Sequence, residues 1–215
     1  MRVMRCFQVI TLAGLLSAST ADAAERPWRV KVFGTATDAT LSAFGQDVED
    51  DAGAGFGLGI ERMLSSRFGL ELDLLASDLE AELPIDFGIP GLKIDLALPT
   101  ETALLKLNWH LTPEGRFDLF LGPLLAYERF DALTVSVSTV SGSESTSADL
   151  LDDDTAWGAH VGFDLFFGGG NTSLTAGLAY WSLTPRLQND DGDIVLDEPA
   201  ELDSLVLSVG VGYRF

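Results

Sequence analysis

Hydrophobic and polar residues alternate along much of the chain, and the alternation is clearest at its end. From Leu205 to Phe215 every second residue is a large apolar one, and the residues between them are Val206, Ser208, Gly210, Gly212 and Arg214. A period of two predicts a β-strand, and about ten residues let a tilted strand cross a bilayer. The apolar face would then meet lipid and the other face the interior of a barrel.

Seven earlier segments share this pattern, so the sequence predicts eight strands: Trp28–Thr37, Ala52–Met63, Phe68–Ser77, Thr102–Leu111, Phe117–Tyr127, Thr155–Phe167, Thr172–Leu183 and Ser204–Phe215. The connections between them alternate in length. Three are short, namely Leu64–Arg67, Thr112–Arg116 and Gly168–Asn171, whereas the others are long. Short periplasmic turns and long extracellular loops are typical of outer-membrane barrels.

The predicted fold class is therefore all-β: an eight-stranded antiparallel transmembrane β-barrel with short periplasmic turns and long extracellular loops. A soluble lipocalin-like barrel also has eight strands. It would place its apolar residues inside, whereas here the richer apolar face lies opposite a face of glycine, serine and charged residues.

The amino terminus predicts export. Residues 1–23 combine Arg2 and Arg5, a short apolar centre and small residues before a cleavage site, as in a secretory signal peptide. We expect residues 24–215 to form one barrel domain in the outer membrane of a Gram-negative bacterium, in contact with lipid and lipopolysaccharide. Cys6 is the only cysteine, so the mature chain would have no disulfide.

The chain is strongly acidic, with a formal net charge of −20. This charge argues against a nucleic-acid partner, whose phosphates it would repel. Acidic runs such as Asp47–Asp51, Asp152–Asp154 and Asp190–Asp193 could hold Ca²⁺. None matches a full calcium loop, so we expect solvated loop charge, no metal site and no cofactor.

With the apolar face outward, the inward charges gather in the periplasmic half of the lumen. Unpaired charges in a narrow lumen are unfavourable, so mixed signs at one level predict an ion-paired layer. This layer would plug the periplasmic end, or would only pack the interior. Its members are Arg29, Lys31, Glu61, Glu71, Asp73, Lys106, His110, Asp118, Asp164 and Arg214.

The extracellular half of the lumen is predicted to be apolar, lined by Phe33, Leu75, Leu104, Leu124, Trp181 and Val206. Beyond the membrane, Pro90-Gly91 predicts a turn in a hairpin that continues the third and fourth strands. Its inward residues would form an apolar funnel, or an ordinary hydrophobic loop cluster: Leu83, Ile85, Phe87, Ile89, Leu92, Ile94 and Leu96.

Pro123 lies within the fifth strand, on the lipid side. Proline cannot donate a ladder hydrogen bond, so it predicts a bulge or a local break in pairing. The break could be a lateral opening into the bilayer or a simple strand bend.

These features predict an outer-membrane channel for passive uptake of small hydrophobic molecules, closed toward the periplasm. A structural, adhesion or stress-related barrel acting through its acidic loops is an alternative. A lipid-modifying enzyme is another, but deacylation needs a serine beside a histidine and a carboxylate. Neither His110 nor His160 has a serine at short spacing on the lipid face, so we expect no catalytic residues.

Several segments make the chain similar to the OmpW/AlkL family of small outer-membrane barrels. They are Phe68–Leu72, Phe117–Tyr127, Asp154–Ala159, Tyr180–Thr184 and Val211–Phe215. The resemblance implies passage of small hydrophobic compounds through an apolar channel with lateral release. The final Phe215 also resembles the terminal signal that barrel-assembly machinery recognises. The polar stretch Ser141–Ser147 and the long apolar hairpin depart from the family, which leaves the solute open.

Overall fold

The computed structural model describes residues 28–43, 46–49, 53–82, 93–113, 115–139, 142–148, 151–167, 170–186 and 201–215. The expected signal peptide, residues 1–23, lies outside these ranges. No helix in the described ranges is long and apolar enough to cross a membrane. The strands are β1 Trp28–Ala43, β2 Gln46–Glu49, β3 Gly53–Met63, β4 Phe68–Glu82, β5 Lys93–His110, β6 Phe117–Phe130, β7 Leu133–Thr139, β8 Gly142–Ala148, β9 Asp154–Phe167, β10 Thr172–Leu183 and β11 Glu201–Arg214.

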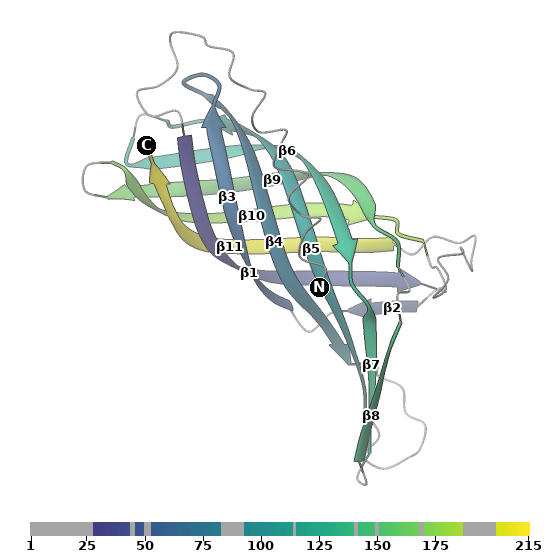
Figure 1. Cartoon of the computed structure of the whole chain (residues 1–215). Helices are drawn as coiled ribbons and strands as arrows, with labels where there is room; N and C mark the ends of the chain where they lie inside the picture. The colour runs from purple at the N-terminus through teal and green to yellow at the C-terminus, as the bar shows by residue number, and fades with distance from the viewer. Residues whose placement is uncertain are drawn as a thin grey trace, which may run out of the picture.

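Eight of these strands close into an antiparallel barrel, which confirms the predicted fold class (Figure 1). They follow the order β4, β3, β1, β11, β10, β9, β6, β5, and pairing of β5 with β4 closes the ring. The first and the last strand, β1 and β11, pair with each other. There the amide of Phe215 donates to the carbonyl of Trp28 at 3.0 Å.

Several strands run beyond their predicted ends on the side of the long loops. Pairing of β4 with β5 continues to Glu82 and Asp95, so this hairpin extends the barrel wall as predicted. The sequence did not predict β2, β7 or β8. Lys93–Ala97 of β5 pairs with β7, and β7 pairs with β8, which gives an arm that projects from the barrel (Figure 1).

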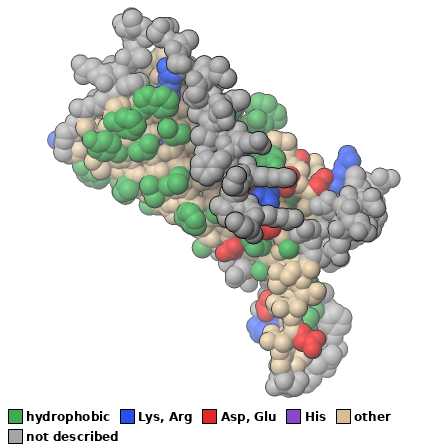
Figure 2. Space-filling view, in the orientation of Figure 1, with side chains coloured by type: hydrophobic (Ala, Val, Ile, Leu, Met, Phe, Trp, Pro, Cys, Tyr) green, Lys and Arg blue, Asp and Glu red, His purple; other side chains and the backbone are tan. Residues whose placement is uncertain are grey.

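The outer wall of the barrel carries large exposed hydrophobic side chains, as the alternation predicts. They gather over the barrel strands in Figure 2, whereas acidic side chains lie toward the arm. On β9, the outward Trp157 and Phe167 are ten residues apart and mark the two ends of this surface. Ten residues span about 33 Å along a strand. At a tilt of about 40° they cover a height of about 25 Å, the thickness of the apolar band in such barrels.

Pro123 interrupts a ladder without shifting its register. Lys106 pairs with Leu124 and Trp109 pairs with Leu121, so β5 and β6 keep the same offset on both sides. No residue is inserted, so of the two predicted outcomes the structure has the break in pairing and not the bulge. Pro123 still pairs with Ala159 of β9 on its other side.

Glycines on the inner face make room for large side chains from neighbouring strands. A Cβ atom on Gly57 of β3 would lie 2.3 Å from Cε2 of Phe33, which faces it from β1. Gly34, on the outer face of β1, has no comparable neighbour within the described residues, the nearest atom being 3.9 Å away.

We expect Gly57→Val to lower the free energy of unfolding by about 1–3 kcal/mol, because the ring of Phe33 must leave its position in the core. Urea unfolding in lipid vesicles measures the change. Gly34→Val is the matched control and should be nearly neutral. Equal stability of the two variants would show that Phe33 is not held against Gly57.

Candidate functional site

The lower part of the lumen holds a buried network of charged side chains centred on Arg29 of β1. Arg29 lies 3.1 Å from Glu61 of β3 and 3.4 Å from Asp118 of β6, and it also donates to Asp164 of β9. Arg214 of β11 donates to the same Asp118 at 3.1 Å. One guanidinium thus connects strands on opposite sides of the barrel.

His110 of β5 completes this lower tier. Its Nδ1 lies 2.8 Å from Asp118 and its Nε2 lies 2.9 Å from Glu61. Carboxylate oxygens of ionised acids only accept hydrogen bonds, so an imidazole ring that donates to both carboxylates is protonated and carries a positive charge.

A second tier lies directly above. Lys31 of β1 donates to Glu71 of β4 at 2.6 Å, and Lys106 of β5 donates to Asp73 of β4. Asn108 joins the tiers because its amide nitrogen donates to both Glu61 and Glu71.

All ten charged residues of the predicted layer meet in this network. Counting His110 as charged, five cations face five anions: Arg29, Lys31, Lys106, His110 and Arg214 against Glu61, Glu71, Asp73, Asp118 and Asp164. Eight are buried, while Lys106 and Arg214 keep 12% and 19% of their side chains exposed. Balanced pairing removes the main penalty of burying so many charges.

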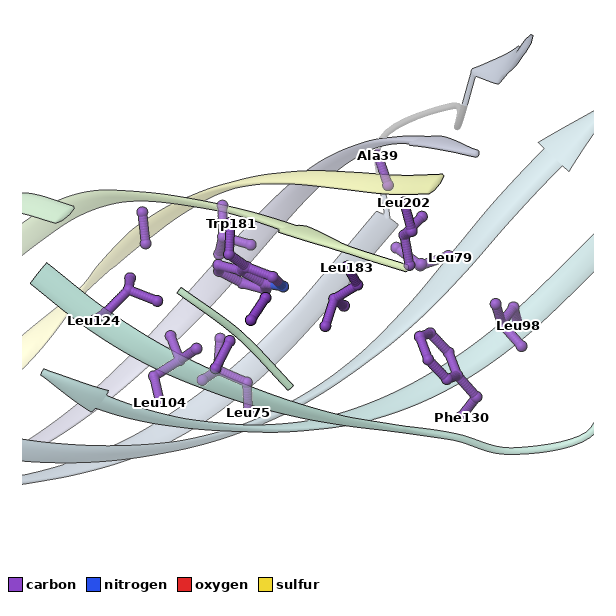
Figure 3. Packing of buried hydrophobic residues seen from close by; sticks show 14 of the residues in the cluster. Ala39, Leu75, Leu79, Leu98, Leu104, Leu124, Phe130, Trp181, Leu183 and Leu202 are labelled. Atoms are coloured by element: carbon purple, nitrogen blue, oxygen red, sulfur yellow. The ribbon is translucent and has the colours of Figure 1, made fainter. Parts of the chain in front are cut away.

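Above the network most buried residues are apolar, although Thr102, Glu128 and Ser204 are buried among them. The six residues predicted to line it are all buried and belong to one cluster: Phe33, Leu75, Leu104, Leu124, Trp181 and Val206. Leu104 and Leu124 are each 1% exposed. Figure 3 shows Trp181 between these leucines and Leu183.

Trp181 has one polar contact, with a side chain two strands away around the barrel wall. Its indole nitrogen on β10 donates to the carboxylate of Glu128 on β6 at 3.0 Å, and both side chains are buried. Because β9 lies between these two strands, the indole spans part of the barrel interior. Trp181 therefore separates the lower apolar residues from those nearer the loops.

The apolar cluster continues toward the loops through Leu98, which lies on the inward face predicted for the hairpin, and through five residues that the sequence analysis did not single out. These five are Leu79, Phe130, Leu151, Leu183 and Leu202, and Figure 3 labels all of them except Leu151. Four of the five could have been found by extending each strand's inward parity two to four residues further. Leu151 precedes its strand, and no periodicity indicates it.

The predicted funnel is only partly described. Ile94 and Leu96 are half-buried and alternate with the exposed Lys93 and Asp95. Leu83, Ile85, Phe87, Ile89 and Leu92 lie outside the described residues.

A small cavity lies where the charged and apolar parts of the lumen meet. Its volume is about 30 Å³. Lys31, Glu71, Asp73, Lys106 and His160 line its lower side, and Phe33, Leu75, Leu104, Ala179 and Val206 its upper side. The boundary predicted between the two halves of the lumen therefore coincides with empty space.

The described residues offer neither a catalytic triad nor a metal centre. His110 contacts carboxylates, and His160 contacts Asn108. Within the described part of the chain, no three histidine, cysteine or acidic side chains are placed to hold a metal ion. Of the acidic runs considered for Ca²⁺, Asp152–Asp154 lies within that part, Asp47–Asp51 lies partly within it, and Asp190–Asp193 lies outside it.

Comparisons with known structures agree on the architecture. OprG from Pseudomonas aeruginosa is 14% identical, with a TM-score of 0.56, over 88% of this chain and 96% of that one. AlkL, determined in lipid bilayers, is 17% identical with a TM-score of 0.56, over 92% and 94%. The outer-membrane protease OmpT from Escherichia coli is 10% identical with a TM-score of 0.50, over 93% and 99%. At such identities the likeness concerns the fold alone.

Sequence comparison identifies the family. No curated protein sequence matches the chain significantly. The model of the outer membrane protein beta-barrel domain matches residues 9–215, which include every strand described above. The chain therefore belongs to the outer membrane protein beta-barrel domain family.

Proposed function

We propose that this barrel admits small hydrophobic molecules passively into the outer membrane. The observation that carries the proposal is the continuous apolar cluster in the outer lumen, which begins directly above a charge-balanced layer. A barrel of eight strands has room inside for side chains or one small ligand. Purely structural packing does not require the apolar residues to continue from mid-membrane to the loops.

The charged layer acts as a plug in this proposal. A solute without polar groups makes no favourable contact with the paired charges, and it would have to separate these ion pairs in order to pass. It would therefore leave through the wall, and the break in the β5–β6 ladder at Pro123 is the candidate lateral opening. Ile94, Leu96 and the other apolar hairpin residues would act as the entry funnel.

Membership of the OmpW/AlkL group is part of the same proposal. The similar folds of OprG and AlkL support it, together with the sequence segments named above. Recognition of Phe215 by assembly machinery and removal of residues 1–23 remain expectations of this assignment.

Expression in an outer membrane tests the proposal. Cells that make the protein should take up radiolabelled octane several-fold faster than cells carrying an empty vector, and uptake of a hydrophilic sugar should not change. Equal octane uptake in the two strains would contradict the proposal.

A surface-contact role is the second candidate, because β7 and β8 form an arm that projects beyond the barrel (Figure 1). Deleting residues 133–148 distinguishes the two functions. A transport barrel should keep most of its octane uptake, whereas an adhesive barrel should lose binding of cells to a surface.

A further inference from the structure

Two residues that line the cavity at the boundary of the lumen each carry a polar atom without a hydrogen-bond partner among the described residues, namely Nδ1 of His160 and Oδ1 of Asp73. His160 lines the cavity and is 6% exposed. Among the described residues, none lies within hydrogen-bonding distance of its Nδ1. A buried polar atom without a partner is unfavourable and indicates a missing partner, either water or a ligand.

Neighbouring residues determine which kind of partner fits. Asn108 donates through its amide nitrogen to Glu61 and Glu71, so its oxygen is the atom that faces His160. The Nε2 of His160 must therefore donate to that oxygen, at 2.7 Å. The cavity already has two lysines on its lower side, so a second proton on the ring would add an unpaired charge. Nδ1 is then a free acceptor, and it needs a donor.

The size and polarity of the cavity narrow the class of ligand. A cavity needs a volume of roughly 10–15 Å³ to hold one water molecule, so this cavity of about 30 Å³ holds about two non-hydrogen atoms. A hydroxyl group and the carbon that carries it match this size. A carboxylate has no proton to donate to Nδ1, and an ammonium group would add charge to a balanced layer.

We propose that the lumen binds hydroxylated hydrocarbons, such as aliphatic alcohols, with the hydroxyl group in this cavity and donating to His160. The proposal rests on the uptake function and names one class of solute that the lumen would bind through a hydrogen bond. The hydrocarbon chain would extend upward from Phe33, Leu75, Leu104 and Val206, which requires Trp181 to move aside. An alkane has no donor, and a ketone has only an acceptor, so neither satisfies Nδ1.

Nitrogen NMR of the full protein in lipid bilayers, labelled only at histidine, tests this binding directly. The chain has two histidines, and both nitrogens of His110 already face carboxylates. Octanol should therefore shift the Nδ1 signal of His160 and leave His110 unchanged, while octane and octanone should shift neither. His160→Gln assigns the signals.

Three results would overturn the proposal. In the first, octanol leaves the Nδ1 signal of His160 at the position of a nitrogen without a hydrogen bond. In the second, the signal is already at the position of a nitrogen bonded to water, and octanol does not change it. In the third, octanol, octane and octanone all shift the signal by the same amount. The second result would mean that the cavity holds structural water only. Octane uptake by cells is a separate measurement, so failure of hydroxyl recognition is distinguishable from failure of the uptake function.

Substitution adds a second readout. Of the four tryptophans only Trp181 is buried in the lumen, so its fluorescence reports octanol binding. We expect His160→Leu to weaken octanol binding roughly five-fold, as loss of one hydrogen bond implies, and His160→Gln to retain an acceptor and bind more tightly than His160→Leu. Equal affinity of wild type and His160→Leu would contradict the assigned contact.

Discussion

Replacing Arg29 with methionine is expected to lower the free energy of unfolding by about 3–5 kcal/mol, the usual effect of removing one partner from a buried ion pair. The guanidinium of Arg29 faces Glu61, Asp118 and Asp164, and all four side chains are buried. Its loss leaves three carboxylates with one fewer cation in a place that water hardly reaches. Methionine keeps much of the side-chain volume, so the loss of stability reports the removal of the charge and not the loss of packing.

Arg214→Met is the matched control for this prediction. Arg214 contacts only Asp118 among the described carboxylates and is partly exposed, so we expect a loss of about 1 kcal/mol. Urea unfolding of both variants in lipid vesicles provides the comparison. Similar losses would mean that the layer does not depend on Arg29 as its centre, and no loss from Arg29→Met would contradict the described network.

The second large effect concerns transport. We expect Leu124→Asp to abolish the gain in octane uptake while the barrel still assembles. Leu124 is 1% exposed in the apolar cluster, so an aspartate there would bring water or a proton into the lumen and make the site unfavourable for an apolar solute. Leu104→Asp and Trp181→Asp should act in the same way.

Leu124→Met tests whether the effect depends on polarity. Methionine has nearly the same volume and remains apolar, so uptake should stay within about two-fold of wild type. Resistance of the folded barrel to denaturation by detergent at room temperature confirms assembly of each variant. Unchanged octane uptake in an assembled Leu124→Asp barrel would favour a purely structural role for the cluster.

The alternation of residues predicted the barrel well because each strand separates two environments. One residue of slip in β11 would turn Leu207 and Val211 inward and Arg214 toward lipid, so the pattern allows one register only. The same parity placed Lys31 and Glu71 inside, and their opposite charges indicated pairing. Burial thus follows from periodicity wherever a strand lies in the membrane.

Other features depend on distances that periodicity does not contain. Nothing in the spacing of Glu128 and Trp181 indicates that the two side chains meet inside the barrel, because β9 separates their strands. The role of Asn108 was likewise missed, since an uncharged residue gives no signal of pairing. In β7 the residues Leu133, Val135 and Val137 alternate with threonine and serine, a strand pattern that the sequence analysis missed, whereas β8 has no apolar face that would indicate a strand.

Crystals of the protein soaked with iodooctane test whether the outer lumen receives an apolar solute above the charged layer, because anomalous scattering locates iodine. We expect an iodine peak inside the barrel among Leu75, Leu104 and Trp181, with the charged layer intact below it. Iodine found only on the lipid-facing surface would show that the solute does not enter the lumen.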